Sequence, residues 1–474
     1  MMTGTDLILL LPSLLLAAFA VIAMLGIAVR RSHGWTAFCA ACGFLLAIAA
    51  GWRSLPLLPR PVTGLLFFDR FALLMTTVIL AAGLAVSLIS HAYLSRGEGR
   101  NEEFSILLLI ASLGAAVLAA SVHFAAFFLG LELLTVSLYG LIAYPRRGRS
   151  YEAGMKYLIL AAVSSAFLLF GMALVYAETG SLAFPPNMHH LPAEVHSPLL
   201  LAGFGLMIAG VGFKLALVPF HLWTPDVYEG APAPVTAFIA TASKTAVFAV
   251  LLRLAPSLSL QPGSPLFAGL SLIAVLSMLA GNLLALRQEN VKRMLAYSSI
   301  AHLGYVLVPF LAGGSAGASA AVFYLIAYTV TSLGAFGTVA VLSGKGQDRD
   351  SLEDYRGLAW RQPGTAAVLS VMFLSLAGMP VTGGFMAKVA LVSAGVHASL
   401  WLLLAALVAG SVIGLFYYLR MITAIFSPPG AVIRLPVQLS LLGNGVLALL
   451  LFVLLWLGLL PGPLLRLVQA SLPF

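Results

Sequence analysis

Residues 199–218 have the sequence LLLAGFGLMIAGVGFKLALV, in which Lys214 is the only charged residue. A run of this length matches the roughly 20 apolar residues that an α-helix needs to cross a membrane. A β-barrel is excluded, because barrel strands alternate apolar and polar residues in shorter segments. The stretch therefore predicts a membrane-spanning helix that carries a lysine inside the membrane.

The whole chain shares this apolar character. Of its 474 residues, 61% are hydrophobic and 9% are charged, whereas a soluble globular chain carries about 25% charged residues. This composition excludes a soluble enzyme, a disordered chain and a nucleic-acid-binding protein, although the net charge is +9. We predict an all-α polytopic membrane protein with fourteen spans, at residues 7–29, 35–52, 71–90, 104–122, 124–144, 157–177, 199–218, 233–255, 265–286, 294–312, 318–343, 364–396 (interrupted), 398–426 and 437–460.

The positions of Lys and Arg predict how the chain is oriented in the membrane. With these spans, 17 of the 25 Lys and Arg residues fall in loops or near span ends on one side, 5 do so on the other side, and 3 lie deep inside spans. Cytoplasmic loops carry an excess of Lys and Arg in membrane proteins. We therefore predict that both termini lie outside, on the periplasmic face.

Four ionisable residues lie within apolar spans: Glu132, Lys214, Lys244 and Lys388. Each costs about 2.5–3.5 kcal/mol near the centre of a helix on insertion scales, and such residues usually mark an ion path. One alternative is a structural ion pair between Glu132 and one lysine, but three cations face a single acid. A lysine, unlike an arginine, can give up its proton. The four residues therefore predict a proton relay.

Helix-breaking residues stand beside two of these lysines. Pro219 and Pro225 follow Lys214, and a segment with Gly378 and Pro380 precedes Lys388. Proline removes a backbone hydrogen bond, and broken helices in matching places of two halves indicate an inverted repeat, although each break alone is also consistent with a simple kink. We predict two inverted five-helix repeats, each with one broken helix, at 104–255 and 256–426, after a three-helix segment at 1–103 and before a C-terminal helix within 427–474.

Weaker candidates surround this set. His221 and His302 are candidates to relay protons, or each is a satisfied interior histidine. Lys156 is a further candidate, but Glu152 lies four residues before it, which also fits an ordinary helical ion pair. Asp226 and Glu229 fall in a predicted cytoplasmic loop at 219–232, where they either guide protons inward or are simply solvated.

Four segments resemble the antiporter-like membrane subunits of NADH-quinone oxidoreductase (respiratory complex I). They are FLGLEL at 128–133, EAGMKY at 152–157, KLALVPFHLWTPDVYEGAPAP at 214–234 and NVKRMLAYSSIAHLGY at 290–305. The resemblance covers nearly the whole chain, most strongly 100–430, and the segment at 214–234 is highly specific. Within the family, the N type is favoured. The chain ends soon after its last predicted span, without the lateral helix of the largest subunit, and it has Lys388 where the M type carries a glutamate.

The resemblance implies a proton channel built from two inverted five-helix units. It implies that Glu132 is the acid of the fifth helix, Lys214 the lysine of the broken seventh, Lys244 the relay lysine of the eighth and Lys388 the terminal residue of the broken twelfth. Lys156 matches a lysine of the family's sixth helix.

The resemblance also implies that the chain is one subunit of a translocase in a bacterial inner membrane, flanked by other membrane subunits. It couples electron transfer from NADH to quinone to proton movement. NADH, FMN, iron–sulfur clusters and quinone are expected on other subunits, and no cofactor or metal is expected on this chain.

Three other functions stay open at this point. The first is a homologous subunit of a multi-subunit cation/proton antiporter or a membrane-bound hydrogenase, which shares the fold and much of the relay. The second is a membrane scaffold without transport, and the third is a single-chain secondary transporter.

Overall fold

The computed structural model describes residues 3–96, 101–184, 197–258, 260–344, 348–428 and 440–472. Their helices and strands are α1 (Gly4–Val29), α2 (His33–Arg53), β1 (Arg60–Val62), β2 (Leu66–Phe68), α3 (Arg70–Ser95), α4 (Glu103–Ala120), α5 (Phe124–Ile142), α6 (Gly148–Thr179), α7 (Pro198–Leu215), α8 (Trp223–Gly230), α9 (Ala233–Phe238), α10 (Lys244–Leu254), α11 (Pro265–Ala285), α12 (Val291–Ala312), α13 (Gly314–Leu342), α14 (Leu358–Arg361), α15 (Pro363–Ala377), α16 (Gly383–His397), α17 (Trp401–Phe426), α18 (Leu441–Leu459) and α19 (Gly462–Ser471).

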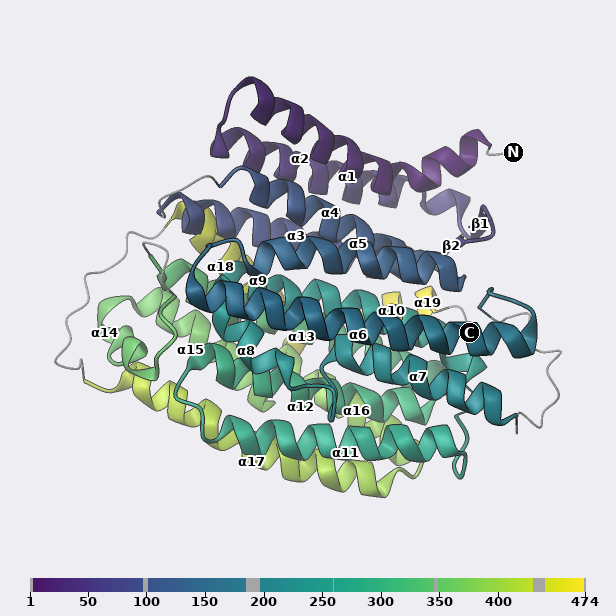
Figure 1. Ribbon diagram of the computed structural model, residues 1–474. Helices are drawn as coiled ribbons and strands as arrows, with labels where there is room; N and C mark the ends of the chain where they lie inside the picture. Colours follow the sequence, from purple (N-terminus) through teal and green to yellow (C-terminus); the bar gives the residue numbers. More distant parts are fainter. Residues whose placement is uncertain are drawn as a thin grey trace.

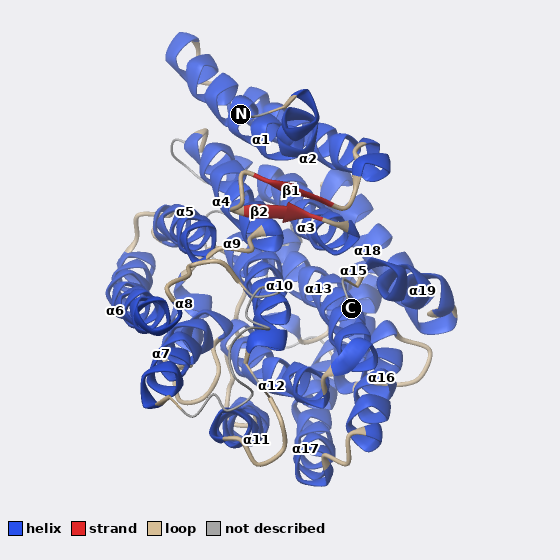
Figure 2. Ribbon diagram, turned by 90° about the vertical axis from the view of Figure 1, so that its right-hand side faces the viewer, coloured by secondary structure: helices blue, strands red, loops and turns tan. Residues whose placement is uncertain are grey.

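The helices stack side by side, with α1 and α2 at one edge and α11 and α17 at the opposite edge (Figures 1 and 2). Within the described ranges, thirteen helical segments are long and apolar enough to cross a membrane. They fall on the predicted spans, and the predicted span at 364–396 is divided between α15 and α16. The prediction of an all-α polytopic membrane protein is confirmed.

The interior of the stack consists of α12, α13 and the segment from α9 to α10, which are buried along nearly all of their length. By contrast, α1, α6 and α11 expose large apolar side chains, such as Phe170 and Leu272. Exposed apolar faces of this extent suit contact with lipid or with another membrane chain. The buried helices are therefore the ones that can hold polar groups away from lipid.

Two helix ends determine where the lysines sit. Helix α7 ends at Leu215, four residues before Pro219, and the next residue, Ala216, adopts the left-handed conformation with φ 61°. Helix α15 ends with Gly378 at φ 84°, where a Cβ atom would lie 2.7 Å from Cδ of Lys388. Glycine at 378 is thus required both by the backbone conformation and by the close approach of the lysine.

One local prediction was wrong, and two others gain detail from the structure. The predicted cytoplasmic loop at 219–232 contains α8, which packs against α6 and α12 because its apolar side chains, among them Trp223 and Val227, are buried. The predicted span at 233–255 is confirmed at Ala233–Ser257, and it contains a π-helical turn at Ile239–Ser243 directly before Lys244. Helix α6 begins at Gly148 rather than at 157, so Lys156 lies inside it.

Three further elements had no prediction. Strands β1 and β2 pair antiparallel next to α3 and α4 (Figure 2), and α19 packs against α3 and α13. Because α3 also contacts α9, α13 and α18, the N-terminal segment is packed into the rest of the bundle. The division of the chain into two inverted repeats stays a prediction.

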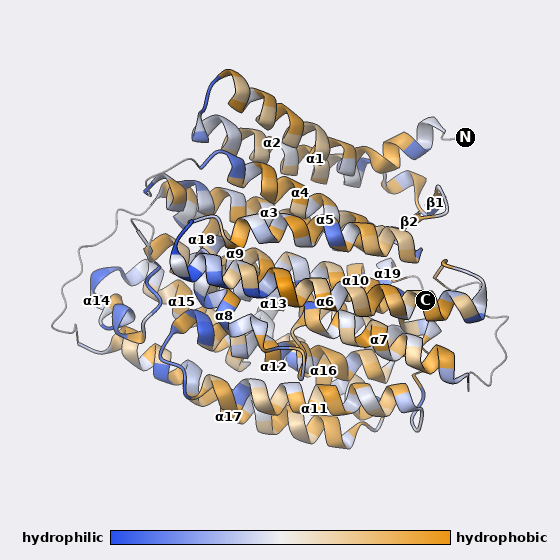
Figure 3. Ribbon diagram, in the orientation of Figure 1, coloured by the Kyte–Doolittle hydropathy of each residue, from blue (hydrophilic) through white to orange (hydrophobic). Residues whose placement is uncertain are grey.

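Hydrophilic residues gather toward the end of the stack that carries α14, whereas the middle of most helices is hydrophobic (Figure 3). Both ends of the chain lie at the other end of the stack (Figure 1). We refer to the first of these as the polar end. This separation agrees with the uneven division of Lys and Arg, and which face is cytoplasmic stays a prediction.

Candidate functional site

Glu132 and Lys214 are linked through helix α5 and not by a direct ion pair. The Nζ atom of Lys214 donates to Oγ1 of Thr135 at 2.7 Å, and Thr135 lies one turn after Glu132 on the same face of α5. Glu132 accepts a hydrogen bond of 2.5 Å from the hydroxyl of Ser165 on α6. Among the described residues, no ion pair within 4.0 Å includes Glu132, so the alternative of a direct structural pair finds no support there.

Lys244 lies at the centre of the molecule, 1% exposed, at the point where the π-helical turn passes into α10. Its Nζ atom donates to the hydroxyl of Ser299 on α12 at 2.6 Å, and Tyr328 on α13 donates to the same oxygen at 2.6 Å. The ring of Tyr228 faces the ammonium at 5.8 Å, as a cation–π contact. A π-helical turn widens the helix locally and often occurs at functional sites.

His302 continues the polar line along α12. Its Nδ1 atom lies 2.6 Å from the hydroxyl of Tyr324, and its Nε2 atom lies 3.2 Å from the hydroxyl of Tyr418. The ring of Tyr328, which bonds Ser299 beside Lys244, lies 5.4 Å from the imidazole ring. The histidine is therefore satisfied by tyrosines, and it lies next to the partners of Lys244.

Lys388 on α16 occupies the far end of this line. Its Nζ atom donates to the carbonyl of Ala377, at the end of α15, at 2.9 Å and to the hydroxyl of Ser411 on α17 at 3.2 Å. Lys388 and His302 line one small cavity of about 10 Å³. A space of that size holds about one water molecule. The broken helix thus turns a carbonyl toward the lysine.

The connection between α7 and α8 lies between Lys214 and Lys244. Tyr157, whose ring lies 5.5 Å from Nζ of Lys214, contacts Trp223, and Trp223 contacts Tyr228 beside Lys244. Three buried polar atoms of this segment have no hydrogen-bond partner among the described residues: Nδ1 of His221, Oγ1 of Thr224 and the hydroxyl of Tyr228. Buried polar atoms nearly always have a partner, and ordered water often fills that role.

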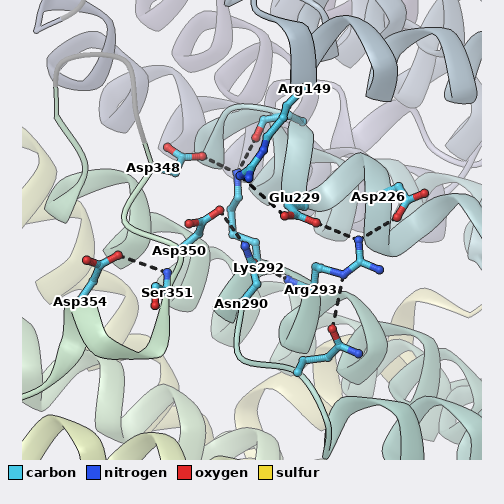
Figure 4. A network of polar contacts seen from close by, with 12 residues as sticks. Arg149, Asp226, Glu229, Asn290, Lys292, Arg293, Asp348, Asp350, Ser351 and Asp354 are labelled. Atoms are coloured by element: carbon cyan, nitrogen blue, oxygen red, sulfur yellow. Dashed lines mark hydrogen bonds and ion pairs between the residues drawn. The ribbon is translucent and has the colours of Figure 1, made fainter.

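Lys156 belongs to a different group of residues at the polar end, drawn in Figure 4 without Lys156 itself. Its Nζ atom contacts Asp226 and Glu152, each at 2.7 Å, and Arg293 contacts Asp226 at 2.7 Å and Glu229 at 2.8 Å. Burial alone would raise the pKa of Asp226, but the hydrogen bonds from Lys156 and Arg293 outweigh burial and hold the pKa below its usual 3.8. Asp226 and Glu229 are thus paired and not merely solvated.

The sequence predictions found the lysines but not most of their partners. Ser299 was only one of several hydroxyl-bearing residues near His302, and Tyr328, Tyr418 and Thr135 carried no signal of their own in the sequence. Tyr324 and Tyr328 are four residues apart on one face of α13, a spacing that points both at one neighbour. The arrangement offers titratable amines and an imidazole, joined by hydroxyls, across the width of the protein.

The chain is similar over nearly its full length to proteins of one kind. Residues 121–414 match the family model described as NADH:quinone oxidoreductase/Mrp antiporter, transmembrane. The chain is 48% identical over 478 residues to NADH-quinone oxidoreductase subunit N of Ectopseudomonas mendocina (strain ymp), and the alignment covers 98% of this chain and 97% of that relative.

Solved structures show the same fold. A chain of respiratory complex I from Thermus thermophilus, solved with bound aureothin, has a TM-score of 0.84 and 34% identity, covering 97% of this chain and 100% of that chain. A chain of the membrane-bound sulfane sulfur reductase, an archaeal respiratory membrane complex, has a TM-score of 0.86 and 25% identity, covering 98% of this chain and 96% of that chain.

Proposed function

The chain belongs to the NADH:quinone oxidoreductase/Mrp antiporter family of transmembrane subunits, and from this premise we propose that it moves protons as the N-type subunit of a bacterial respiratory complex I. Other subunits of that complex hold NADH, FMN, the iron–sulfur clusters and quinone. Other membrane subunits flank this chain, and its polar end faces the cytoplasm.

One observation supports a relay most strongly: the three deep lysines have neutral partners. Thr135 accepts from Lys214, Ser299 accepts from Lys244, and Ala377 and Ser411 accept from Lys388. A lysine with a neutral acceptor can lose its proton without leaving an unpaired carboxylate behind, and a neutral amine can still accept a hydrogen bond. This is the chemistry that a proton carrier needs.

The proposed sequence of events begins at Glu132. A change of charge near Glu132, which is partly exposed on α5, alters the field at Lys214, which bonds Thr135 one helical turn after Glu132. Lys214 then exchanges a proton with Lys244 across the segment with the unpartnered His221, Thr224 and Tyr228. From Lys244 the proton passes the Ser299 and Tyr328 hydroxyls and His302 toward Lys388.

The test replaces Lys214 by Ala and by Arg in the assembled complex. The measurement is the rate of NADH-driven proton uptake into vesicles, normalised to the amount of assembled complex. Arg keeps the charge but does not release a proton near neutral pH. A relay predicts that both variants lose pumping. A purely structural role predicts that Lys214→Arg pumps like the parent, and this result, or normal pumping by Lys214→Ala, would refute the proposal.

The family also includes subunits of cation/proton antiporters. That alternative shares the same residues, so chemistry alone does not separate the two. Purification of the intact assembly decides between them. A purified complex I oxidises NADH, whereas a purified cation/proton antiporter does not.

A further inference from the structure

A cleft of about 520 Å³ opens at the polar end of the bundle. It lies between the end of α3, the start of α6, the end of α8, the start of α12 and the segment 348–354. Arg149, Glu229 and Asp350 lie on its walls. Water therefore has access to a space lined by charged groups that reaches toward the buried helices.

Lys292 and Asp348 also line this cleft, and Figure 4 shows both among the charged side chains there. Their side chains are 2% and 8% exposed, and Nζ of Lys292 lies 2.5 Å from Oδ2 of Asp348. The same Nζ donates to the carbonyl of Ala231 at 2.8 Å, and Tyr93 donates to the other carboxylate oxygen at 2.8 Å. This pair is the most buried of the lysine–carboxylate pairs in the described part of the chain.

Helix α8 contributes residues both to the cleft and to the surroundings of Lys244. Glu229 and Gly230 line the cleft, and the preceding residue, Tyr228, places its ring 5.8 Å from Nζ of Lys244. The hydroxyl of Tyr228 is buried without a hydrogen-bond partner among the described residues. A buried hydroxyl of this kind calls for a water molecule as its partner.

Helix α12 joins the same two places from the other side. Lys292 and Ser299 are seven residues apart, which is two helical turns and about 10 Å on one face. Ser299 is the acceptor for Lys244. Lys292 of the ion pair and Ser299 beside Lys244 therefore lie on the same face of α12, two turns apart.

We propose that Lys292 and Asp348 form the gate through which protons pass from the cleft to Lys244, an inference that rests on the proposed function. Hydronium in the cleft gives its proton to the carboxylate of Asp348, which becomes neutral and releases Lys292. Lys292 then gives one of its protons to water beside Tyr228 and takes the proton of Asp348 in return. The pair regains its starting charges, and one proton has moved inward.

The test uses three conservative variants in the assembled complex: Lys292→Arg, Asp348→Asn and Tyr228→Phe. Asp350→Asn is the matched control, because Asp350 lines the same cleft but accepts from Asn290 instead of Lys292. We expect each of the three variants to lower the rate of NADH-driven pumping, normalised to assembled complex, by about tenfold or more. The control should change this rate by less than about twofold.

Lys292→Arg keeps the ion pair, and Tyr228→Phe keeps the packing. Because neither variant removes a buried charge, we expect both to fold and assemble. Normal pumping by either variant overturns the gate. Lys244→Met separates the two proposals. If Lys244→Met stops pumping while Lys292→Arg and Tyr228→Phe pump normally, the gate is wrong and the relay stands. If Lys244→Met pumps normally, the relay itself fails.

Discussion

The bundle holds lysines in two kinds of surroundings. At the polar end, Lys156 contacts two carboxylates, Asp226 and Glu152, and its side chain is 42% exposed. At the centre, Lys244 is 1% exposed and contacts a serine hydroxyl and a tyrosine ring. The first lysine has charged partners and is open to solvent, whereas the second is buried and has no charged partner among the described residues.

Under the proposed function, this difference separates a lysine that holds its charge from one that passes a proton on. Taking the proton from Lys156 leaves two carboxylates that have lost a counter-charge, so that lysine is stabilised as a cation. Taking the proton from Lys244 leaves a neutral amine that can accept a hydrogen bond from Ser299. Lys292 stands between the two cases, because it is as buried as the central lysine but is paired with a carboxylate.

The largest effect is expected for Lys244→Met. Methionine is close to lysine in length but cannot carry a proton, so we expect pumping to fall by at least about tenfold. The measurement is the rate of proton uptake into NADH-energised vesicles, normalised to assembled complex. A membrane scaffold without transport predicts altered assembly with unchanged pumping, and that outcome would remove Lys244 from the relay.

A smaller effect is expected for Ser299→Ala, which leaves Lys244 and Tyr328 without their shared acceptor. Leaving a buried donor unsatisfied costs about 1–3 kcal/mol, and we expect pumping to fall several-fold. Ser112→Ala is the control, because Ser112 is also fully buried but bonds only the carbonyl of Leu108 in its own helix. Equal losses in both variants would mean that a buried hydroxyl matters for packing alone.

A still smaller effect is expected for Lys156→Met. Arg293 still neutralises Asp226 at 2.7 Å, and an exposed pair contributes only about 0–1 kcal/mol. Pumping should therefore fall by less than about twofold. A loss as large as that of Lys244→Met, in the same vesicle assay, would erase the distinction between the two kinds of lysine.

The smallest effect concerns pH. Because the pKa of Asp226 is held below 3.8, its stabilising contribution is complete above that value and is lost only as pH falls through the lower pKa of the folded state. Asp226→Asn should lower the thermal midpoint of the complex in detergent by a constant amount between about pH 8 and about pH 5. A difference that shrinks within that window would contradict the paired carboxylate.

The spans and the deep lysines could be predicted from the sequence, because a run of apolar residues with one charge has a clear meaning in a membrane. The break before Lys388 could also be anticipated, since Gly378 and Pro380 are both unsuited to a continuous helix. The hydrogen-bond partners of the deep lysines could not be predicted from the sequence. Thr135 and Ser299 look like many other hydroxyl-bearing residues of membrane helices, which usually bond their own backbone.

Lys156 has one partner that could be predicted from the sequence and one that could not. Its sequence neighbour Glu152 predicted a helical pair, and the structure contains that pair at 2.7 Å. The second partner, Asp226, is 70 residues away in the sequence and was placed in a predicted cytoplasmic loop, with no prediction that it contacts Lys156. Only the packing of α8 against α6 brings the two together.

The sequence by itself determined that this chain lies in a membrane and that it keeps four ionisable groups there, because both facts follow from composition and position along single helices. Tertiary structure alone decided what each of those groups contacts, and the proposed division between a lysine held as a cation and lysines that exchange protons rests on those contacts. Partners 55 to 79 residues apart meet only when helices pack, and the energy of a buried charge depends on those partners more than on the residue itself.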